Sequence, residues 1–194
     1  APRGLGPPPG ARPAVPILHT SATRSIVAPG PAEDGRFAGA GDFAIAGIPG
    51  TASKIVLEYV DPGGSVTGKL LPTGNVRDVL QVPGVGPIEV SIVDAANPLV
   101  FVRFEDLGLT GDEPLDKIAG DPKMLARIES VRAHAGVLAG PGTTPEEMTA
   151  SAPAGPTLAL VARPRPSRPL TGAPVHDAAL APCPQEWRAP PAIP

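Results

Sequence analysis

Hydrophobic and polar residues alternate in a series of short runs along the first half of the chain. In the clearest run, Ser53–Val60, the side chains of Ile55 and Leu57 would share one face of an extended strand. Turn sequences such as Asp61-Pro62-Gly63-Gly64 separate the runs, and short strands joined by close turns predict an antiparallel sheet. The expected strands are 17–28 (one strand or a hairpin), 41–48, 53–60 with 66–71 as its hairpin partner, 76–82, 88–94 and 99–104.

The run from Ile88 to Asp94 ends in a carboxylate, that of Asp94. Its alternation places Ile88, Val90 and Ile92 on one face of the strand. Asp94 then ends an apolar strand directly before Ala95-Ala96-Asn97-Pro98, which sets this carboxylate apart from the solvated carboxylates elsewhere in the chain.

A helical period replaces the alternation after residue 120. Asp121 followed by Pro122 is a favourable helix start, because the carboxylate can cap free backbone N–H groups and proline at the first helical position loses no hydrogen bond. Apolar residues then recur at spacings of four, three and four, which predicts a helix that ends near Gly136 or Ala139. This apolar stripe consists of Met124, Ile128, Val131 and Ala135, with Arg127, Glu129 and Arg132 off it.

Two further elements complete the expected order. Thr144-Pro145-Glu146-Glu147 has the sequence of a capping box and predicts a second, short helix. Leu158–Ala162 predicts a buried strand. An order of many strands, a helix and then a strand favours an α+β fold over a doubly wound sheet, in which strands and helices would alternate from the start.

Proline is concentrated at the two ends of the chain. Eight of the 29 prolines lie in residues 1–32 and thirteen lie in residues 141–194. Runs such as Pro7-Pro8-Pro9 cannot join a central strand or the interior of a helix, because proline lacks the backbone N–H group and fixes φ. We therefore expect residues 1–16 and 163–194 to be extended linker or tail.

Charge and cysteine content narrow the classes of function. A net charge of −3, with no basic patch interleaved with aromatic residues, argues against nucleic-acid binding. No run of 18 apolar residues predicts a membrane span, and the single cysteine, Cys183, fits a free thiol in a cytoplasmic protein. His19, His134 and His176 lack metal-ligand spacing, so we expect no metal site.

Two glycine-rich segments match nucleotide-binding patterns in part. Gly63–Lys69 fits a P-loop up to its final position, where Leu70 offers no hydroxyl group to Mg²⁺. Gly39–Ala44 fits the dinucleotide-binding hexamer, but no apolar strand precedes it and no helical pattern follows it. We interpret the first segment as a hairpin turn and the second as a chance match, and we expect no nucleotide cofactor.

Three longer segments occur in an order that resembles the PrpF family of 2-methylaconitate isomerases and related tautomerases. They are GDFAIAGIPGT (Gly41–Thr51), DPGGSVTGKLLPTGN (Asp61–Asn75) and VSIVDAANPLVFVRFEDLGLTGDE (Val90–Glu113). The resemblance implies a fold like that of diaminopimelate epimerase: two similar domains, each a curled sheet around a helix, with the substrate between them. It also implies a proton-transfer isomerisation of a small unsaturated tricarboxylate without metal or organic cofactor, and allows for a homo-oligomer.

The resemblance also suggests domain boundaries and candidate site residues. Residues 17–75 would form the end of the family's N-terminal domain and residues 76–162 the start of its C-terminal domain. Asn97 is the first candidate for substrate binding, because its side-chain amide can donate to a carboxylate, although asparagine is also common as a turn residue before proline. Thr73, Gly74 and Asn75, on a predicted exposed turn, are the second candidates.

Several departures from the family pattern predict an incomplete and inactive chain. The family's acid/base lysine and cysteine are expected in segments upstream of this sequence, so no catalytic residue is assigned, and Lys69 is expected to be a solvated strand residue. Position 46 is alanine where the family leads us to expect an acidic residue. Both proline-rich ends would be non-native translation products flanking a genuine core. The alternative is a degenerate, non-catalytic relative that retains a carboxylate-binding pocket.

Overall fold

The computed structural model describes residues 14–19, 24–33, 36–45, 48–152, 155–163 and 183–187. These residues form two compact units, with the division after Asp61. Ala46, His176 and most of both proline-rich ends lie outside the described residues. The predicted domain boundaries at 16/17, 75/76 and 162/163 stay predictions.

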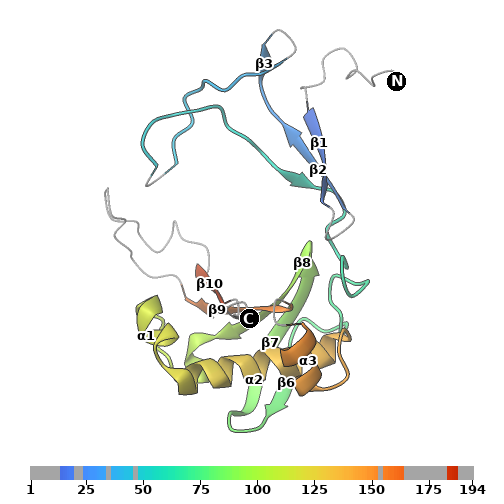
Figure 1. The fold of residues 1–194 in the computed structure, drawn as a ribbon, viewed down its shortest axis with the longest axis vertical. Coiled ribbons are helices and arrows are strands. Elements are labelled where there is room, and N and C mark those ends of the chain that lie inside the picture. Colours follow the sequence, from blue (N-terminus) through green and yellow to red (C-terminus); the bar gives the residue numbers. More distant parts are fainter. Residues whose placement is uncertain are drawn as a thin grey trace. The chain divides into compact units, whose positions relative to one another are not determined.

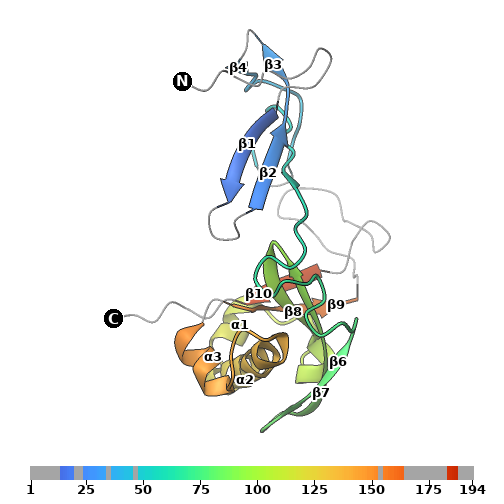
Figure 2. The same cartoon turned by 90° about the vertical axis from the view of Figure 1, so that its right-hand side faces the viewer.

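The first unit is built on a β-hairpin. Strands β1 (Ala14–His19) and β2 (Arg24–Pro29) pair antiparallel, as predicted for the segment 17–28. A two-residue strand, β5 (Glu58–Tyr59), pairs with the other edge of β2, and β3 (Ala32–Glu33) pairs with β4 (Arg36–Phe37) (Figure 2). The unit is therefore a small antiparallel sheet with a short second ribbon.

Three predicted strands around the unit boundary are largely wrong. Phe43 pairs with Ala52 only as an isolated bridge, and of the segment 53–60 only β5 forms a strand. The segment 66–71 is a series of turns instead of a hairpin partner. A strand needs a neighbouring backbone to accept and donate its hydrogen bonds, and alternation in the sequence cannot supply one.

The second unit contains a five-stranded sheet in the order β10-β9-β8-β7-β6 (Figure 1). The antiparallel pairing predicted for the strands before residue 104 is confirmed for β6, β7 and β8, and β10 is antiparallel to β9, whereas the later strand β9 is parallel to β8. All the described helices lie between β8 and β9, and such a crossover returns the chain in the same direction. The strands are β6 (Asp78–Val82), β7 (Gly86–Ala95), β8 (Asn97–Arg103), β9 (Thr157–Ala162) and β10 (Cys183–Trp187).

The long helix α2 (Pro122–Ala139) lies against one face of this sheet, with α3 (Pro145–Ser151) beside it (Figures 1 and 2). As predicted, the Asp121 carboxylate caps α2 by accepting hydrogen bonds from two backbone N–H groups of its first turn. Thr144 caps α3 through the Glu147 N–H group. The short elements η1 (Phe104–Leu107) and α1 (Leu115–Ala119) precede α2.

The main hydrophobic core lies between α2 and the sheet. It combines the predicted buried face of β7 with three residues of the predicted stripe of α2, while the fourth, Met124, is partly buried against it. Among the described residues of the first unit, only Ile26 and Ala28 are buried hydrophobics. The structure is thus α+β, and its core belongs to the second unit. The central members are Ile88, Val90, Ile92, Val100, Val102, Ile128, Val131, Leu158 and Leu160.

Part of the expected C-terminal tail is ordered as strand β10. Cys183 lies opposite Ala162 in its antiparallel pairing with β9. Proline at position 184 is compatible with this strand because β10 is at the edge of the sheet. The prediction of linker throughout residues 163–194 therefore needs correction at 183–187.

Candidate functional site

Asp94 is a carboxylate on the buried face of a strand. It continues the alternation of Ile88, Val90 and Ile92 along β7, and its side chain has no exposed surface. A buried carboxylate is stable only when its charge is compensated by hydrogen bonds or by a cation. The groups that donate hydrogen bonds to Asp94 are therefore the key to the structure around it.

A glycine-rich loop surrounds the Asp94 carboxylate. The backbone N–H groups of Val66 and Thr67 donate to Oδ2 at 2.8 and 2.7 Å. The Ser65 hydroxyl lies 2.7 Å from Oδ1, and the Thr67 hydroxyl lies 2.9 Å from Oδ2. We call Asp94 and the loop Gly64–Thr67 the Asp94 clasp.

Hydrogen bonding keeps the clasp negatively charged. Burial raises the pKa of Asp94, but the hydrogen bonds from Thr67, Ser65 and Val66 outweigh burial and leave the pKa below its ordinary value. The carboxylate is therefore ionised at neutral pH, and its lone pairs are occupied. It is poorly suited to abstract a proton from a substrate.

The clasp accounts for the partial P-loop pattern at Gly63–Lys69. As in a P-loop, successive N–H groups of a glycine-rich loop enclose an anion, but this anion is the chain's own Asp94. Gly64 has a φ of +72°, and a Cβ there would lie 2.4 Å from the Gly68 carbonyl carbon. Glycine is therefore required at position 64 for the loop to close, and no nucleotide is needed to explain the motif.

The same loop holds the turn that follows β7. The Ala96 N–H group donates to the Pro62 carbonyl at 2.7 Å, and the Ser65 hydroxyl also lies 2.9 Å from the Ala96 carbonyl. Ala96 has a φ of +64°, a left-handed conformation that costs a residue with a Cβ roughly 1–2 kcal/mol. Both polar backbone groups of this strained residue are therefore anchored to the loop.

Asn97, the first predicted site residue, follows this anchored turn directly. It is the first residue of β8, lies opposite Ala95 in the pairing with β7, and is exposed. Its side-chain amide makes no hydrogen bond to another residue within the described part of the chain. The amide therefore keeps two donors and an acceptor free for a ligand, and its role in substrate binding stays a prediction.

The second predicted site, the turn Thr73–Asn75, is engaged by another carboxylate. The Thr73 hydroxyl and the Asn75 side-chain amide donate to Asp78 at 2.7 and 2.8 Å. Gly74 between them has a φ of +81°, as a turn glycine can adopt. These contacts use the Thr73 hydroxyl hydrogen and one Asn75 amide hydrogen in the turn itself, which leaves fewer donors for a substrate than at Asn97.

Three residues that form hydrogen bonds in these sites are not among the candidates predicted from the sequence. Ser65 and Thr67 were placed in a plain hairpin turn, and Asp78 was not singled out at all. Asp94 had a readable signal, because the period of two that buries Ile92 also buries residue 94. Asp78 has no comparable signal, since its partners lie in a turn whose conformation the pattern does not specify.

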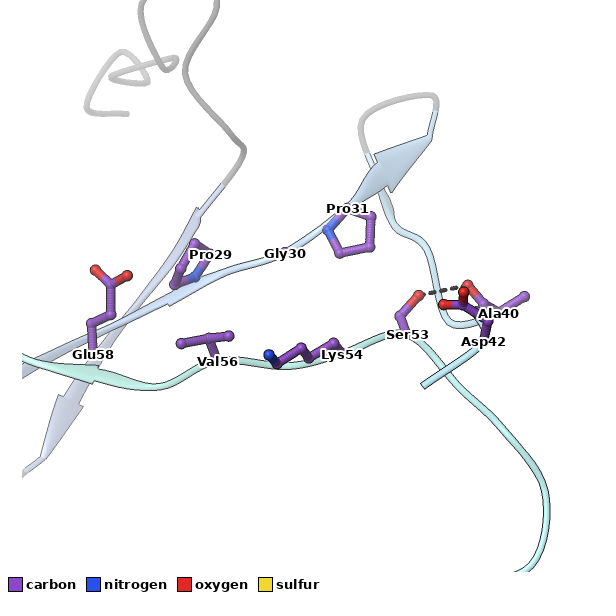
Figure 3. A pocket seen from close by; sticks show the side chains of 10 residues that line it. Pro29, Gly30, Pro31, Ala40, Asp42, Ser53, Lys54, Val56 and Glu58 are labelled. Atoms are coloured by element: carbon purple, nitrogen blue, oxygen red, sulfur yellow. Dashed lines mark hydrogen bonds between the residues drawn. The ribbon is translucent and has the colours of Figure 1, made fainter. Parts of the chain in front are cut away.

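A pocket of about 550 Å³ lies in the first unit, and none of the predicted site residues lines it (Figure 3). Figure 3 shows Lys54 between Glu58 at one end of the lining residues and Asp42 at the other, with Ser53 bonded to the Ala40 carbonyl. Two acidic groups and one lysine give this pocket a negative balance. That charge does not suit a substrate with several carboxylates.

The described residues offer no metal centre. They contain no group of three or more His, Cys, Asp or Glu side chains close enough to hold an ion. His134 has its Nδ1 atom 2.7 Å from the Ser130 carbonyl one helical turn away. In addition, none of the helices in the described ranges is both long and apolar enough to cross a bilayer.

Comparison with known proteins finds relatives that are described as isomerases. A family model described as PrpF protein matches residues 8–181 and thus extends into both proline-rich ends. The chain is 41% identical to 3-methylitaconate isomerase of Eubacterium barkeri, 42% to the putative isomerase YraM of Bacillus subtilis and 35% to 2-methyl-aconitate isomerase of Shewanella oneidensis. These matches cover 76%, 82% and 77% of this chain, but only 39%, 42% and 38% of the relatives.

A solved structure of a similarly named isomerase also matches the chain. A crystal structure described as methylitaconate-delta-isomerase matches with a TM-score of 0.82 and 35% identity, over 94% of this chain and 47% of the relative. The chain therefore spans less than half the length of the proteins that it matches. On the family match and these similarities, the chain belongs to the PrpF family.

Proposed function

We propose that this chain supplies part of the substrate site of a PrpF-type isomerase, which shifts a double bond in an unsaturated di- or tricarboxylic acid by proton transfer. The observation that carries the proposal is the free amide of Asn97 on a turn whose backbone is anchored by the neighbouring loop. The relatives are named as isomerases of methylitaconate and methyl-aconitate and as an oxalomesaconate tautomerase, which supports this substrate class.

Asn97 would act as a hydrogen-bond donor to a substrate carboxylate. Removal of a proton from an allylic carbon leaves negative charge that spreads toward the conjugated carboxylate. A donor already fixed toward that group stabilises the developing charge without reorganising during the reaction. A neutral amide is suitable, because it binds the carboxylate and does not compete for the proton.

No acid or base is assigned among the described residues. Asp94 is ionised, buried and surrounded by donors, so it has no role as a proton carrier in this proposal. In this proposal the described site therefore contributes binding and not proton transfer. This division is compatible with a chain that covers about two fifths of its relatives.

The proposal is tested by proton NMR of the chain with methylitaconate and trans-aconitate in D₂O. Proton transfer at an allylic carbon exchanges hydrogen for deuterium, and binding alone does not. We expect both acids to bind, and we expect Asn97→Ala to weaken binding by about tenfold or more, as for the loss of one hydrogen bond to a charged group.

Gln81→Ala is the matched control, since Gln81 also carries an exposed side-chain amide but lies on β6, outside both candidate sites. It should change affinity much less than Asn97→Ala. Equal effects of the two variants, or no binding of either acid to the wild-type chain, would refute the assignment of Asn97.

A non-catalytic carboxylate-binding module is the second candidate. It is favoured by one observation, namely that the buried carboxylate beside Asn97 is locked in four hydrogen bonds. Deuterium incorporation that requires the protein would exclude this module, whereas saturable binding without incorporation is expected both of the module and of a chain that contributes only the binding part of an isomerase site.

A further inference from the structure

The Asp94 clasp joins two segments that are distant in the sequence. Ser65 and Asp94 are separated by 29 positions, yet the loop and the turn exchange hydrogen bonds at several points. Besides the side-chain contacts, the Gly64 N–H group donates to the Asp94 carbonyl at 2.8 Å, and the Asp94 N–H group donates to the Leu70 carbonyl at 2.9 Å. The loop thus forms a cover over the end of β7.

The clasp requires charge as well as shape. All four groups that face the carboxylate are donors: two backbone N–H groups and the hydroxyls of Ser65 and Thr67. In Asp94→Asn the side-chain oxygen can keep the three donors at the Oδ2 position, and the NH₂ group then faces the Ser65 hydroxyl, which can accept as well as donate. The substitution therefore removes the negative charge that strengthens these hydrogen bonds, and it turns the Ser65 hydroxyl away from residue 94.

The loop also holds the one strained residue between Asp94 and Asn97. The Ala96 N–H group donates to the carbonyl of Pro62, two residues before the loop, and the Ala96 carbonyl lies 2.9 Å from the Ser65 hydroxyl. Ser65 contacts the carboxylate and the Ala96 carbonyl with the same hydroxyl. Loss of the carboxylate would loosen Ser65 and, through it, the conformation of Ala96.

We infer that Asp94 is a positioning residue for Asn97: as an internal anion, it fixes the Gly64–Thr67 loop, which in turn holds Ala96 in its left-handed conformation and directs the Asn97 amide. This inference rests on the proposed role of Asn97 in substrate binding. Asp94 itself does not touch the substrate.

Amide hydrogen exchange of the full chain tests the structural half of the inference. In Asp94→Asn, the N–H groups of Val66, Thr67 and Ala96 should exchange at least about tenfold faster than in the wild type, as their bonded partners are weakened. Unchanged exchange at Ala96, with faster exchange at Val66 and Thr67, would show that the clasp does not reach the turn and would overturn the inference.

Glu113→Gln is the matched control variant. Glu113 is also a loop carboxylate that accepts from two backbone N–H groups and a hydroxyl, and the N–H of Thr110 helps to lower the pKa of Glu113 to about 2. Substitution of Glu113 should speed amide exchange at Thr110 and Gly111 and leave the exchange rate of the Ala96 N–H group unchanged. An equal response of Ala96 in both variants would indicate general loosening and contradict a specific role for Asp94.

Binding of trans-aconitate tests the functional half through a double-mutant cycle. Asp94→Asn should weaken binding about tenfold, and Asn97→Ala should have a much smaller effect in the Asp94→Asn background than in the wild type. Strictly multiplicative effects would show that the two residues act independently. If the wild-type chain fails to bind trans-aconitate, the proposed function fails, while the exchange experiment still decides whether Asp94 fixes the turn.

If Asp94→Asn does not fold, Thr67→Val and Ser65→Ala replace it. Each removes one hydroxyl donor and leaves the carboxylate and the backbone donors in place. Because only Ser65 touches both Asp94 and Ala96, Ser65→Ala should accelerate exchange at Ala96 more than Thr67→Val does. The reverse order would overturn the inference.

Discussion

At the scale of single residues, Asp94 shows how a buried charge is maintained without a salt bridge among the described residues. Its charge is stabilised by neutral donors, and the pKa of Asp94 is lowered although burial alone would raise it. Such a carboxylate stabilises the fold only while it is ionised, so the pH dependence of unfolding reports on it.

We predict that Asp94→Asn lowers the free energy of unfolding by about 1–3 kcal/mol at pH 7, since it replaces charge-assisted hydrogen bonds by weaker neutral ones in a buried site. Because the folded pKa lies below the ordinary value of 3.8, the wild-type advantage is fully present above that pH and is lost as the pH falls through the folded pKa. Urea unfolding of both proteins at pH 7, 5 and 3 measures the difference.

The internal control is the difference in unfolding free energy between the wild type and Asp94→Asn, compared at pH 7 and pH 5. It should be constant there, because Asp94 is ionised in both the folded and the unfolded chain at pH 7 and nearly so at pH 5. A difference that shrinks steadily across this neutral range would contradict the assignment of the effect to Asp94.

The residues of the candidate site were only partly predictable. Asn97 could be chosen because it lies in a segment that resembles a known family, and Asp94 because it ends an apolar strand. The reason why Asn97 is held in place depends on the positive φ of Ala96 and on a loop almost thirty residues earlier. A local pattern contains neither piece of information.

At the scale of elements, α2 is connected to α3 and to the start of β9 by one buried arginine. Arg132 was placed off the apolar stripe of the helix, but only 1% of it is exposed, because α3 and the segment before β9 cover it. Its guanidinium donates twice to Glu129 and also to the carbonyls of Met148, Ala152 and Gly155. All five of its N–H donors are used.

We predict that Arg132→Met lowers the free energy of unfolding by about 3–5 kcal/mol, because it removes the cation that pairs with the Glu129 carboxylate together with the guanidinium donors to three carbonyls. Arg103→Met is the matched control. Arg103 and Asp106 also form a pair three residues apart, but the Arg103 side chain is 53% exposed, and exposed pairs contribute little. Thermal or urea unfolding compares the two variants, and similar losses would contradict a special role for the buried network.

The elements predicted correctly are those that pack on the core. From residue 76 onward, strands and helices fell close to their expected positions, since alternation or a helical stripe coincides there with an actual buried face. Between residues 41 and 71, the same kind of alternation predicted strands that do not form. Ile55 and Leu57 there are 62% and 50% exposed, so the pattern is not accompanied by burial.

At the scale of the whole molecule, the two units differ in how much apolar surface they bury. The core cluster belongs to the second unit, whereas the first unit exposes large apolar side chains such as Leu18, Ile48 and Ile55. Burial of apolar surface is the dominant stabilising contribution to folding. The second unit should therefore account for most of the measurable stability.

We predict that amides of β7, β8 and β9 exchange slowest and those of the first unit fastest, since local opening follows the distribution of buried contacts. Ile92→Ala, at a fully buried position of β7, should lower the free energy of unfolding by about 2–5 kcal/mol. Ile55→Ala removes the same atoms from an exposed position and should change the free energy of unfolding by no more than about 0.5 kcal/mol. A large loss for Ile55→Ala would mean that another surface covers the first unit in solution, and the exchange rates of its strands would then be slow as well.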